Sequence, residues 1–99
     1  MSTVPTDYPA SQAPGASRAQ RFHFAVYALP EPCVMPRVLE QFAKRDLVPT
    51  RWHSAVVDGP RAELQIDVQV DDLEPETGLY IARCLSALVN VNDVVTSAG

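Results

Sequence analysis

The chain has 99 residues, of which 46% are hydrophobic, and its formal net charge at pH 7 is −4. This length is typical of one small domain, and the acidic balance argues against a nucleic-acid partner, which usually needs a basic surface. No apolar run approaches the roughly 20 residues of a membrane-spanning helix, so we expect no membrane partner. The two cysteines, Cys33 and Cys84, lack metal-ligand spacing and are typical of a reduced, cytoplasmic protein without a metal.

The first 20 residues differ in composition from the rest. They are rich in Ser, Ala and Pro, including Pro5, Pro9 and Pro14, and contain few large apolar side chains. Such a segment buries too little apolar surface to offset the entropy lost on ordering. It also lacks the basic start and apolar centre of a secretory signal. We therefore predict a disordered tail over residues 1–20 and a folded domain over residues 21–97.

The folded part begins with a predicted strand over Phe22–Ala28 and a predicted helix over Val34–Asp46. Neither face of the strand is strongly polar, which favours a central position in a sheet. The helix has Pro36 in its first turn, where a missing N–H costs little. The apolar residues at helical spacing predict its buried stripe, which consists of Met35, Val38, Leu39, Phe42 and Ala43. The polar residues, among them Gln41, are expected on the opposite side.

Two further strands form a predicted hairpin. The run Val48–Val57 has Pro49 near its start, which favours an edge strand, and Asp58-Gly59 supplies the turn. In the next run, Ala62–Asp71, apolar and polar residues alternate strictly. One face of that strand is therefore expected in the core and the other in water.

A second helix is expected to begin near Pro75, and a last strand to cover Val91–Thr96. Gly78 lies within this helix and weakens it. The expected buried side of the helix consists of Ile81, Ala82, Leu85, Leu88 and Val89. The order βαββαβ is that of the ferredoxin-like fold. The predicted class is therefore α+β, with a four-stranded antiparallel sheet and both helices on one face.

Several uses of this fold need residues that the chain does not have. RNA-binding domains stack bases on aromatic side chains of the third strand, whereas the outward residues here are Glu63, Gln65, Asp67, Gln69 and Asp71. A heavy-metal chaperone would need two cysteines after the first strand, where only Cys33 is present, and an acylphosphatase-like enzyme would need an arginine there. His23 and His53 are interpreted as surface or interface residues. We expect a non-enzymatic protein without a cofactor, with a small enzyme as an alternative.

The junction between the first strand and the first helix is typical of a site for a small anion, because the first amides of a helix have no intrahelical partner. Prolines within the junction supply no N–H. The amides that remain are those of Glu31, Cys33, Val34 and Met35. Among these, we expect Cys33 and Val34 to act as the backbone donors.

Three segments, in this order, give the chain a resemblance to a known family. They are Glu31-Pro32-Cys33-Val34-Met35-Pro36-Arg37-Val38, Phe42-Ala43-Lys44-Arg45-Asp46-Leu47 and Leu85-Ser86-Ala87-Leu88-Val89-Asn90-Val91. The first is similar to a run of acid, Pro, Gly, Val, Leu, any residue, Arg and Val. The second resembles a helix end of Phe, any residue, Arg or Lys, Arg and Gly, and the third a closing Leu-any-Lys-Leu-Val-Asp-Val. Together they resemble an ACT domain, and more narrowly the short, single-domain small subunit of acetolactate synthase, over residues 21–97.

This resemblance implies a non-catalytic regulatory or stabilising module of branched-chain amino-acid biosynthesis, with a catalytic large subunit as its partner. The alternative is a stand-alone dimer that binds an amino acid or a 2-oxo acid. ACT domains usually pair, which implies a homodimer with Trp52, His53 and Val56 at the interface. The loop that would hold a small amino-acid effector consists of Pro30, Glu31, Pro32, Cys33, Val34 and Met35. Amino-acid-sensing members have Asn and Gly at the positions of Pro30 and Cys33.

Overall fold

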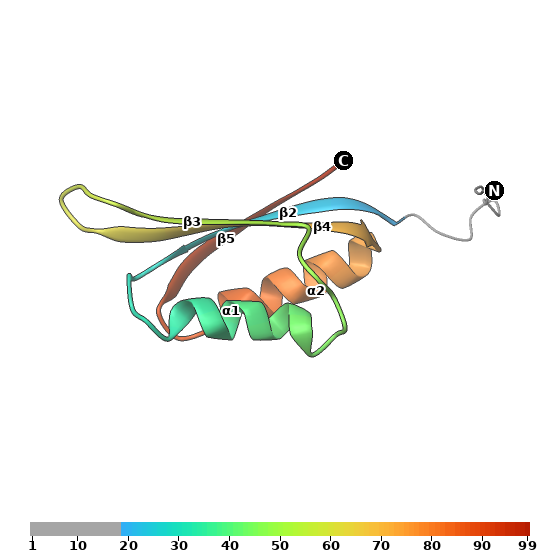
Figure 1. Cartoon of the computed structure of the whole chain (residues 1–99), viewed down its shortest axis with the longest axis horizontal. Coiled ribbons are helices and arrows are strands. Elements are labelled where there is room, and N and C mark those ends of the chain that lie inside the picture. The colour runs from blue at the N-terminus through green and yellow to red at the C-terminus, as the bar shows by residue number, and fades with distance from the viewer. Residues whose placement is uncertain (1–18) are drawn as a thin grey trace.

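The computed structural model describes residues 19–99. Of the predicted tail over residues 1–20, the first 18 residues therefore lie outside the described residues. The elements are β2 (Gln20–Ala28), α1 (Val34–Ala43), β3 (Arg51–Val57), β4 (Glu63–Leu73), α2 (Pro75–Ser86) and β5 (Val91–Ala98). The strands form one antiparallel sheet in the order β3–β4–β2–β5, and both helices cover the same face of it (Figure 1). The predicted ferredoxin-like α+β fold is confirmed, with the first strand central and the second at an edge.

The ends of the elements differ from the predicted ones by a few residues. β2 begins at Gln20, which pairs with Leu73, so this strand includes the last residue assigned to the tail. β3 begins at Arg51, three residues later than expected, and β5 continues to Ala98. Each change extends or trims an element without altering its place in the fold.

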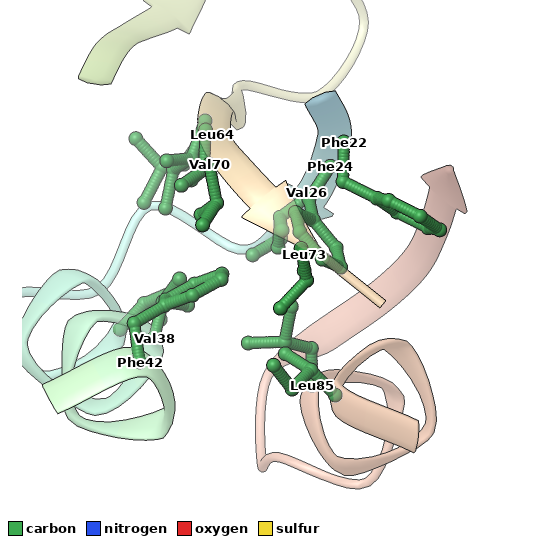
Figure 2. Packing of buried hydrophobic residues seen from close by; sticks show 14 residues of the cluster. Phe22, Phe24, Val26, Val38, Phe42, Leu64, Val70, Leu73 and Leu85 are labelled. Carbon is green, nitrogen blue, oxygen red and sulfur yellow. The ribbon is translucent and has the colours of Figure 1, made fainter. Parts of the chain in front are cut away.

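The core lies between the sheet and the two helices. Alternate residues of the central strands, β2 and β4, point towards the helices, as the pleat of a strand requires. Figure 2 shows Val38 and Phe42 of α1 beneath the β4 side, and Leu85 of α2 beside Leu73. The rings of Phe24 and Phe42 meet edge to face, with centroids 5.2 Å apart. The buried hydrophobic residues are Phe22, Phe24, Val26, Ala28, Val34, Val38, Phe42, Leu64, Ile66, Val68, Val70, Leu73, Ile81 and Leu85.

The buried stripe of α1 differs from the predicted one. Its buried residues are Val34, Val38, Gln41 and Phe42. Met35 and Leu39, which were expected in the core, are 37% and 44% exposed, and Ala43 is exposed as well. Both sets of positions have helical spacing, so the sequence pattern alone does not decide which of two adjoining faces meets the sheet. The prediction was therefore wrong at Met35, Leu39 and Ala43.

Gln41, expected on the solvent side, is buried because it lies on the flank of α1 that faces α2. Its carbonyl oxygen accepts a 2.7 Å hydrogen bond from Nη1 of Arg45, and its side-chain oxygen a longer one at 3.4 Å. Nη2 of Arg45 reaches across to Sγ of Cys84 on α2, at 3.5 Å. The Arg45 guanidinium also lies over the Tyr80 ring, 5.2 Å from its centroid. Polar groups thus join the two helices beside the apolar core.

α1 ends at Ala43, three residues before the predicted end, in a turn through Asp46. The Leu47 N–H donates to the Phe42 carbonyl and the Asp46 N–H to the Ala43 carbonyl, both at 3.0 Å, which is the Schellman pattern. Asp46 has a φ of 59°, in the left-handed region that favours glycine. This is the position where the ACT pattern often has glycine, and Asp is among the few other residues that tolerate it.

A β-bulge near the end of β4 changes which residues face the core. Phe22 pairs with Val70 and Gln20 with Leu73, so two residues of β4 lie opposite Arg21 alone. One of them, Asp72, has a φ of 57°. The extra residue reverses the alternation, and Leu73 is therefore buried, although the simple alternation of β4 would point it outwards. The strand consequently continues past the predicted end at Asp71.

The buried side of α2 is confirmed at Ile81 and Leu85, with Ala82 and Leu88 partly buried against the core. Val89 was expected there but is 68% exposed. α2 ends at Ser86, and the chain then leaves the helix through a turn that includes Asn90 with a φ of 74°. A residue beyond the last helical turn no longer follows the helical period, which explains the error.

Gly78 is buried in α2 against the ring of Phe22. A Cβ at this position would lie 2.5–2.7 Å from three carbon atoms of that ring. The glycine therefore allows the helix to approach β2 closely, and the weakening of the helix that the sequence predicts is the cost of this packing.

We expect Gly78→Ala to lower the free energy of unfolding by about 1–2 kcal/mol, because overpacking outweighs the better helix propensity of Ala. Urea denaturation followed by circular dichroism measures the change. Gly59→Ala is the matched control, since a Cβ there meets its nearest atom at 3.8 Å. The double variant with Phe22→Leu should recover part of the loss. A Gly78→Ala protein more stable than the original would contradict the packing described here.

Candidate functional site

The loop between β2 and α1 is held by its own backbone. The Leu29 N–H donates to the Asn90 carbonyl at 2.9 Å, which fastens the start of the loop to the turn before β5. The Glu31 N–H donates to the Leu29 carbonyl at 2.8 Å, a tight turn centred on Pro30. The Val34 N–H donates to the Glu31 carbonyl at 3.1 Å and closes a second turn. Two successive turns therefore carry the chain from the strand into the helix.

These bonds determine which N–H groups of the loop have a hydrogen-bond partner and which do not. The expectation that Val34 would donate to an anion is not met, because its N–H already bonds to Glu31 and its side chain is 1% exposed in the core. Within residues 19–99, no hydrogen bond engages the N–H groups of Cys33 and Met35. An anion at this helix end would therefore find Cys33 and Met35 as its donors.

The side chains of the predicted effector loop are mostly exposed. Pro30, Glu31, Pro32 and Cys33 are all at the surface, and Met35 is partly so. Cys33 occupies the N-cap position of α1, and its side chain makes no capping hydrogen bond. Neither of the two cavities described below is lined by residues 30–35. The loop thus offers a surface at which a second molecule could complete a site, and not an enclosed pocket.

The three expected interface residues lie on the edge strand β3 but point to different faces. Trp52 is half-buried and packs against the core from the helix side. Val56 points to the same side and is 56% exposed, because the β3–β4 hairpin extends past the helices there (Figure 1). His53 lies on the opposite, open face of the sheet. Val56 pairs with Leu64, which also pairs with Ala28, so Val56 and the loop after β2 are at the same end of the sheet.

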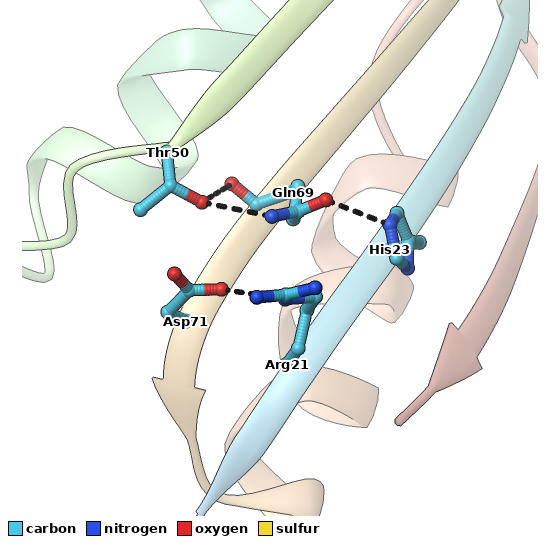
Figure 3. A network of polar contacts seen from close by, with 5 residues as sticks. All are labelled: Arg21, His23, Thr50, Gln69 and Asp71. Carbon is cyan, nitrogen blue, oxygen red and sulfur yellow. Dashed lines mark hydrogen bonds and ion pairs between the residues drawn. The ribbon is translucent and has the colours of Figure 1, made fainter.

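The open face of the sheet carries a network of polar contacts (Figure 3). His23 Nε2 and Gln69 Oε1 are hydrogen-bonded at 2.9 Å. Thr50 Oγ1 donates to the Gln69 carbonyl at 3.2 Å, and Gln69 Nε2 donates to Thr50 Oγ1 at 3.4 Å. Nε of Arg21 pairs with Oδ1 of Asp71 at 3.1 Å. His23 therefore has a structural partner, which agrees with its interpretation as a surface residue.

A cavity of about 540 Å³ lies on this open face, beside the polar network. It is lined by His23, Phe24, Ala25, Arg51, Trp52, His53, Asp67, Val95, Thr96 and Ser97. Sequence reasoning missed it because its residues come from four strands and meet only through the strand register. The sequence feature that could have indicated this cavity is Ala25, which is small among the larger outward residues of a central strand. A second cavity, of about 410 Å³, is lined by Leu29, Arg61, Ala62, Glu63 and Asn92.

Both cysteines are free thiols, with Cys33 exposed and Cys84 half-buried. Within residues 19–99, no group of three or more His, Cys, Asp or Glu side chains is placed to hold a metal ion. In the same part of the chain, neither helix has the length and apolar character needed to cross a bilayer.

No protein-family model matches the chain, and no curated protein matches it in sequence. Among solved structures, it is similar to the solution structure of the C-terminal domain of the MgtC protein from Mycobacterium tuberculosis. The TM-score is 0.61 over 82% of this chain and 88% of that domain, at 17% sequence identity. The likeness establishes the fold. At this identity it carries no function from one protein to the other.

Because Val34 lies in the core, we predict that this loop residue contributes to the stability of the fold. Val34→Ala should lower the free energy of unfolding by about 1–3 kcal/mol, because it leaves a cavity under the start of α1. Cys33→Ala is the matched control and should change stability by less than about 0.5 kcal/mol, since its side chain is exposed and caps nothing. Thermal or urea unfolding measures both. Equal effects for the two variants would contradict the division of roles within the loop.

Proposed function

We propose that this chain is a non-catalytic regulatory or stabilising subunit of the ACT type, which forms a homodimer and serves a catalytic large subunit. The resemblance to the small subunit of acetolactate synthase makes that enzyme the leading partner. The observation that supports the proposal best is an uncovered apolar flank on α1, beside the unpaired edge of β3 and at the same end as the strand-to-helix loop.

The apolar flank consists of Met35 and Leu39. Gln41 and Arg45 mark the side of α1 that faces α2, and the 100° step of a helix places Met35 and Leu39 on the opposite side. The crossover from β2 to β3 places α1 over the β4–β3 half of the sheet, whereas α2 contacts β2 and β5. The flank therefore lies towards the free edge of the sheet. Apolar residues at helical spacing that the monomer does not bury are suited to a partner.

The edge strand adds backbone groups to this surface. β3 is the last strand on its side of the sheet, so along its outer side the N–H and C=O groups have no strand partner within residues 19–99. Val56 is exposed on the same side of the sheet as α1. A second copy that pairs with β3 would extend the sheet and cover both Val56 and the α1 flank. Such a dimer would also bring a second chain close to the free amides of Cys33 and Met35.

The proposed interface predicts that charges on its apolar residues will separate the dimer. Leu39→Glu combined with Val56→Lys should weaken dimerisation at least about tenfold, because each charge must lose water when the surfaces meet. Sedimentation over micromolar concentrations measures the equilibrium. Leu79→Glu, on the exposed side of α2, is the matched control and should leave the dimer intact. An original chain that is monomeric throughout this range would refute the interface.

The partner is tested by co-expression with the large, thiamine-dependent subunit of acetolactate synthase from the same source. We expect the two chains to purify together and the activity of the large subunit, or its response to branched-chain amino acids, to change. Failure of both would refute the regulatory proposal. The alternative, a stand-alone dimer that binds an amino or 2-oxo acid at the loop, is supported by the free amides. It predicts a higher melting temperature with millimolar ligand in the absence of any large subunit.

A further inference from the structure

Within residues 19–99, the sheet ends at β3 on one side and at β5 on the other, and these two edges differ in regularity. β3 pairs with β4 over Arg51–Val57 in an unbroken register. β5 pairs with β2 less regularly, because Asn92 is an extra residue between the partners of Tyr27 and Ala28. A bulge of this kind bends an edge strand and hinders a further strand from pairing with it.

The alternation of an antiparallel ladder decides which backbone groups point to the free edge of β5. The Gly99 N–H donates to the Arg21 carbonyl at 2.9 Å, so these residues form a hydrogen-bonded pair at the end of the β2–β5 ladder. Counted back from that pair, the N–H and C=O groups of Val94, Thr96 and Ala98 face away from β2. A further strand would have to bond to these groups.

The half of this edge nearer the bulge is already engaged within the chain. The Val94 N–H donates to Oδ1 of Asp93 at 2.9 Å, so a carboxylate lies where the carbonyl oxygen of an incoming strand would have to be. The Val91 N–H donates to the Leu88 carbonyl at 3.2 Å. Asp93 is exposed, and it is the only charged residue of β5. A pairing strand would therefore have to displace a charge-assisted hydrogen bond and remove the carboxylate from water.

The edge of β3 has no such obstacle. The same alternation, carried through β2 and β4, directs the backbone groups of Trp52, Ser54 and Val56 outwards. Among residues 19–99, no hydrogen bond engages the N–H groups of these three residues. β3 thus presents an uninterrupted row of outward donors, whereas the row on β5 is interrupted at Val94.

We propose that Asp93 closes the edge of β5 to strand pairing, so that the chain associates through its sheet at β3 alone. Two open edges would otherwise let copies add edge to edge into longer assemblies. β5 is suited to such pairing, because Val91–Ala98 is rich in β-branched residues and Val95 is 51% exposed. The role of β3 rests on the proposed dimer, whereas the closure of β5 does not depend on it.

Sedimentation over micromolar concentrations tests the closure by comparing Asp93→Ala with the original chain. We expect the average mass of the variant to rise at least about twofold above that of the original chain, because the freed β5 edges then pair. Asp67→Ala is the matched control, since it removes an exposed carboxylate from a central strand and should sediment as the original chain does. In hydrogen exchange, the amides of residues 91–98 of Asp93→Ala should become protected as its concentration rises.

The original chain supplies a second measurement, which does not depend on the folding of a variant. In NMR hydrogen exchange, the amide of Thr96 should exchange quickly at every concentration, because no strand pairs with the β5 edge. The amide of Ser54 should exchange more slowly as the concentration rises and β3 dimerises.

Three results would overturn the closure of β5. They are a mass of Asp93→Ala equal to that of the original chain, an equal rise in mass for Asp67→Ala, and concentration-dependent protection of Thr96 in the original chain. A monomeric original chain with an unprotected Ser54 amide would instead refute the proposed dimer at β3. The closure would still be tested in that case, because Asp93→Ala should then form dimers while the original chain does not.

Discussion

The fold depends on covering one face of a four-stranded sheet with two short helices. Neither helix could be stable alone at this length, so burial of the alternate residues of β2 and β4 is what holds the domain together. The same alternation has a second result. Every buried residue of these strands has neighbours along the chain that point to the open face, and this fixes the rows of side chains that line the cavity there.

The two helices cover different parts of the same sheet face, and this explains where exposed apolar residues suited to a protein partner lie. α2 packs against β2 and β5 and also contacts α1. Because α1 connects β2 to β3, which flank β4 in the sheet, the crossover carries it towards the side of the sheet that ends at β3. Because α1 turns Val34, Val38 and Phe42 towards the core, its other large apolar residues, Met35 and Leu39, remain exposed. The hairpin of β3 and β4 extends beyond the helices and leaves Val56 exposed (Figure 1). This asymmetry thus produces the surface proposed for dimerisation.

The contacts that sequence reasoning missed share a physical origin. The stripe of α1 was misplaced because two adjoining faces of the helix have apolar residues at the same period, and only the position of the sheet selects between them. Gln41 is buried because Arg45 reaches it and Cys84 from one side. Leu73 is buried because an unpredicted bulge reverses the alternation of β4. Val34 likewise lies in the core, with its N–H bonded to the Glu31 carbonyl, because of the two turns between β2 and α1, which no residue pattern specifies.

The sequence by itself determined the order of the elements, the central and edge positions of the first two strands, and the ferredoxin-like class, since these follow from periodicity and turn residues that act over short distances. It also located the strand-to-helix loop and the resemblance to ACT domains. Only the tertiary structure decided which α1 face is buried, which loop amides are free, and that Arg51, Asp67, Ala25 and Val95 meet in one cavity. The reason is that these properties depend on strand register and on helix rotation about its axis, which are set when distant parts of the chain pack together.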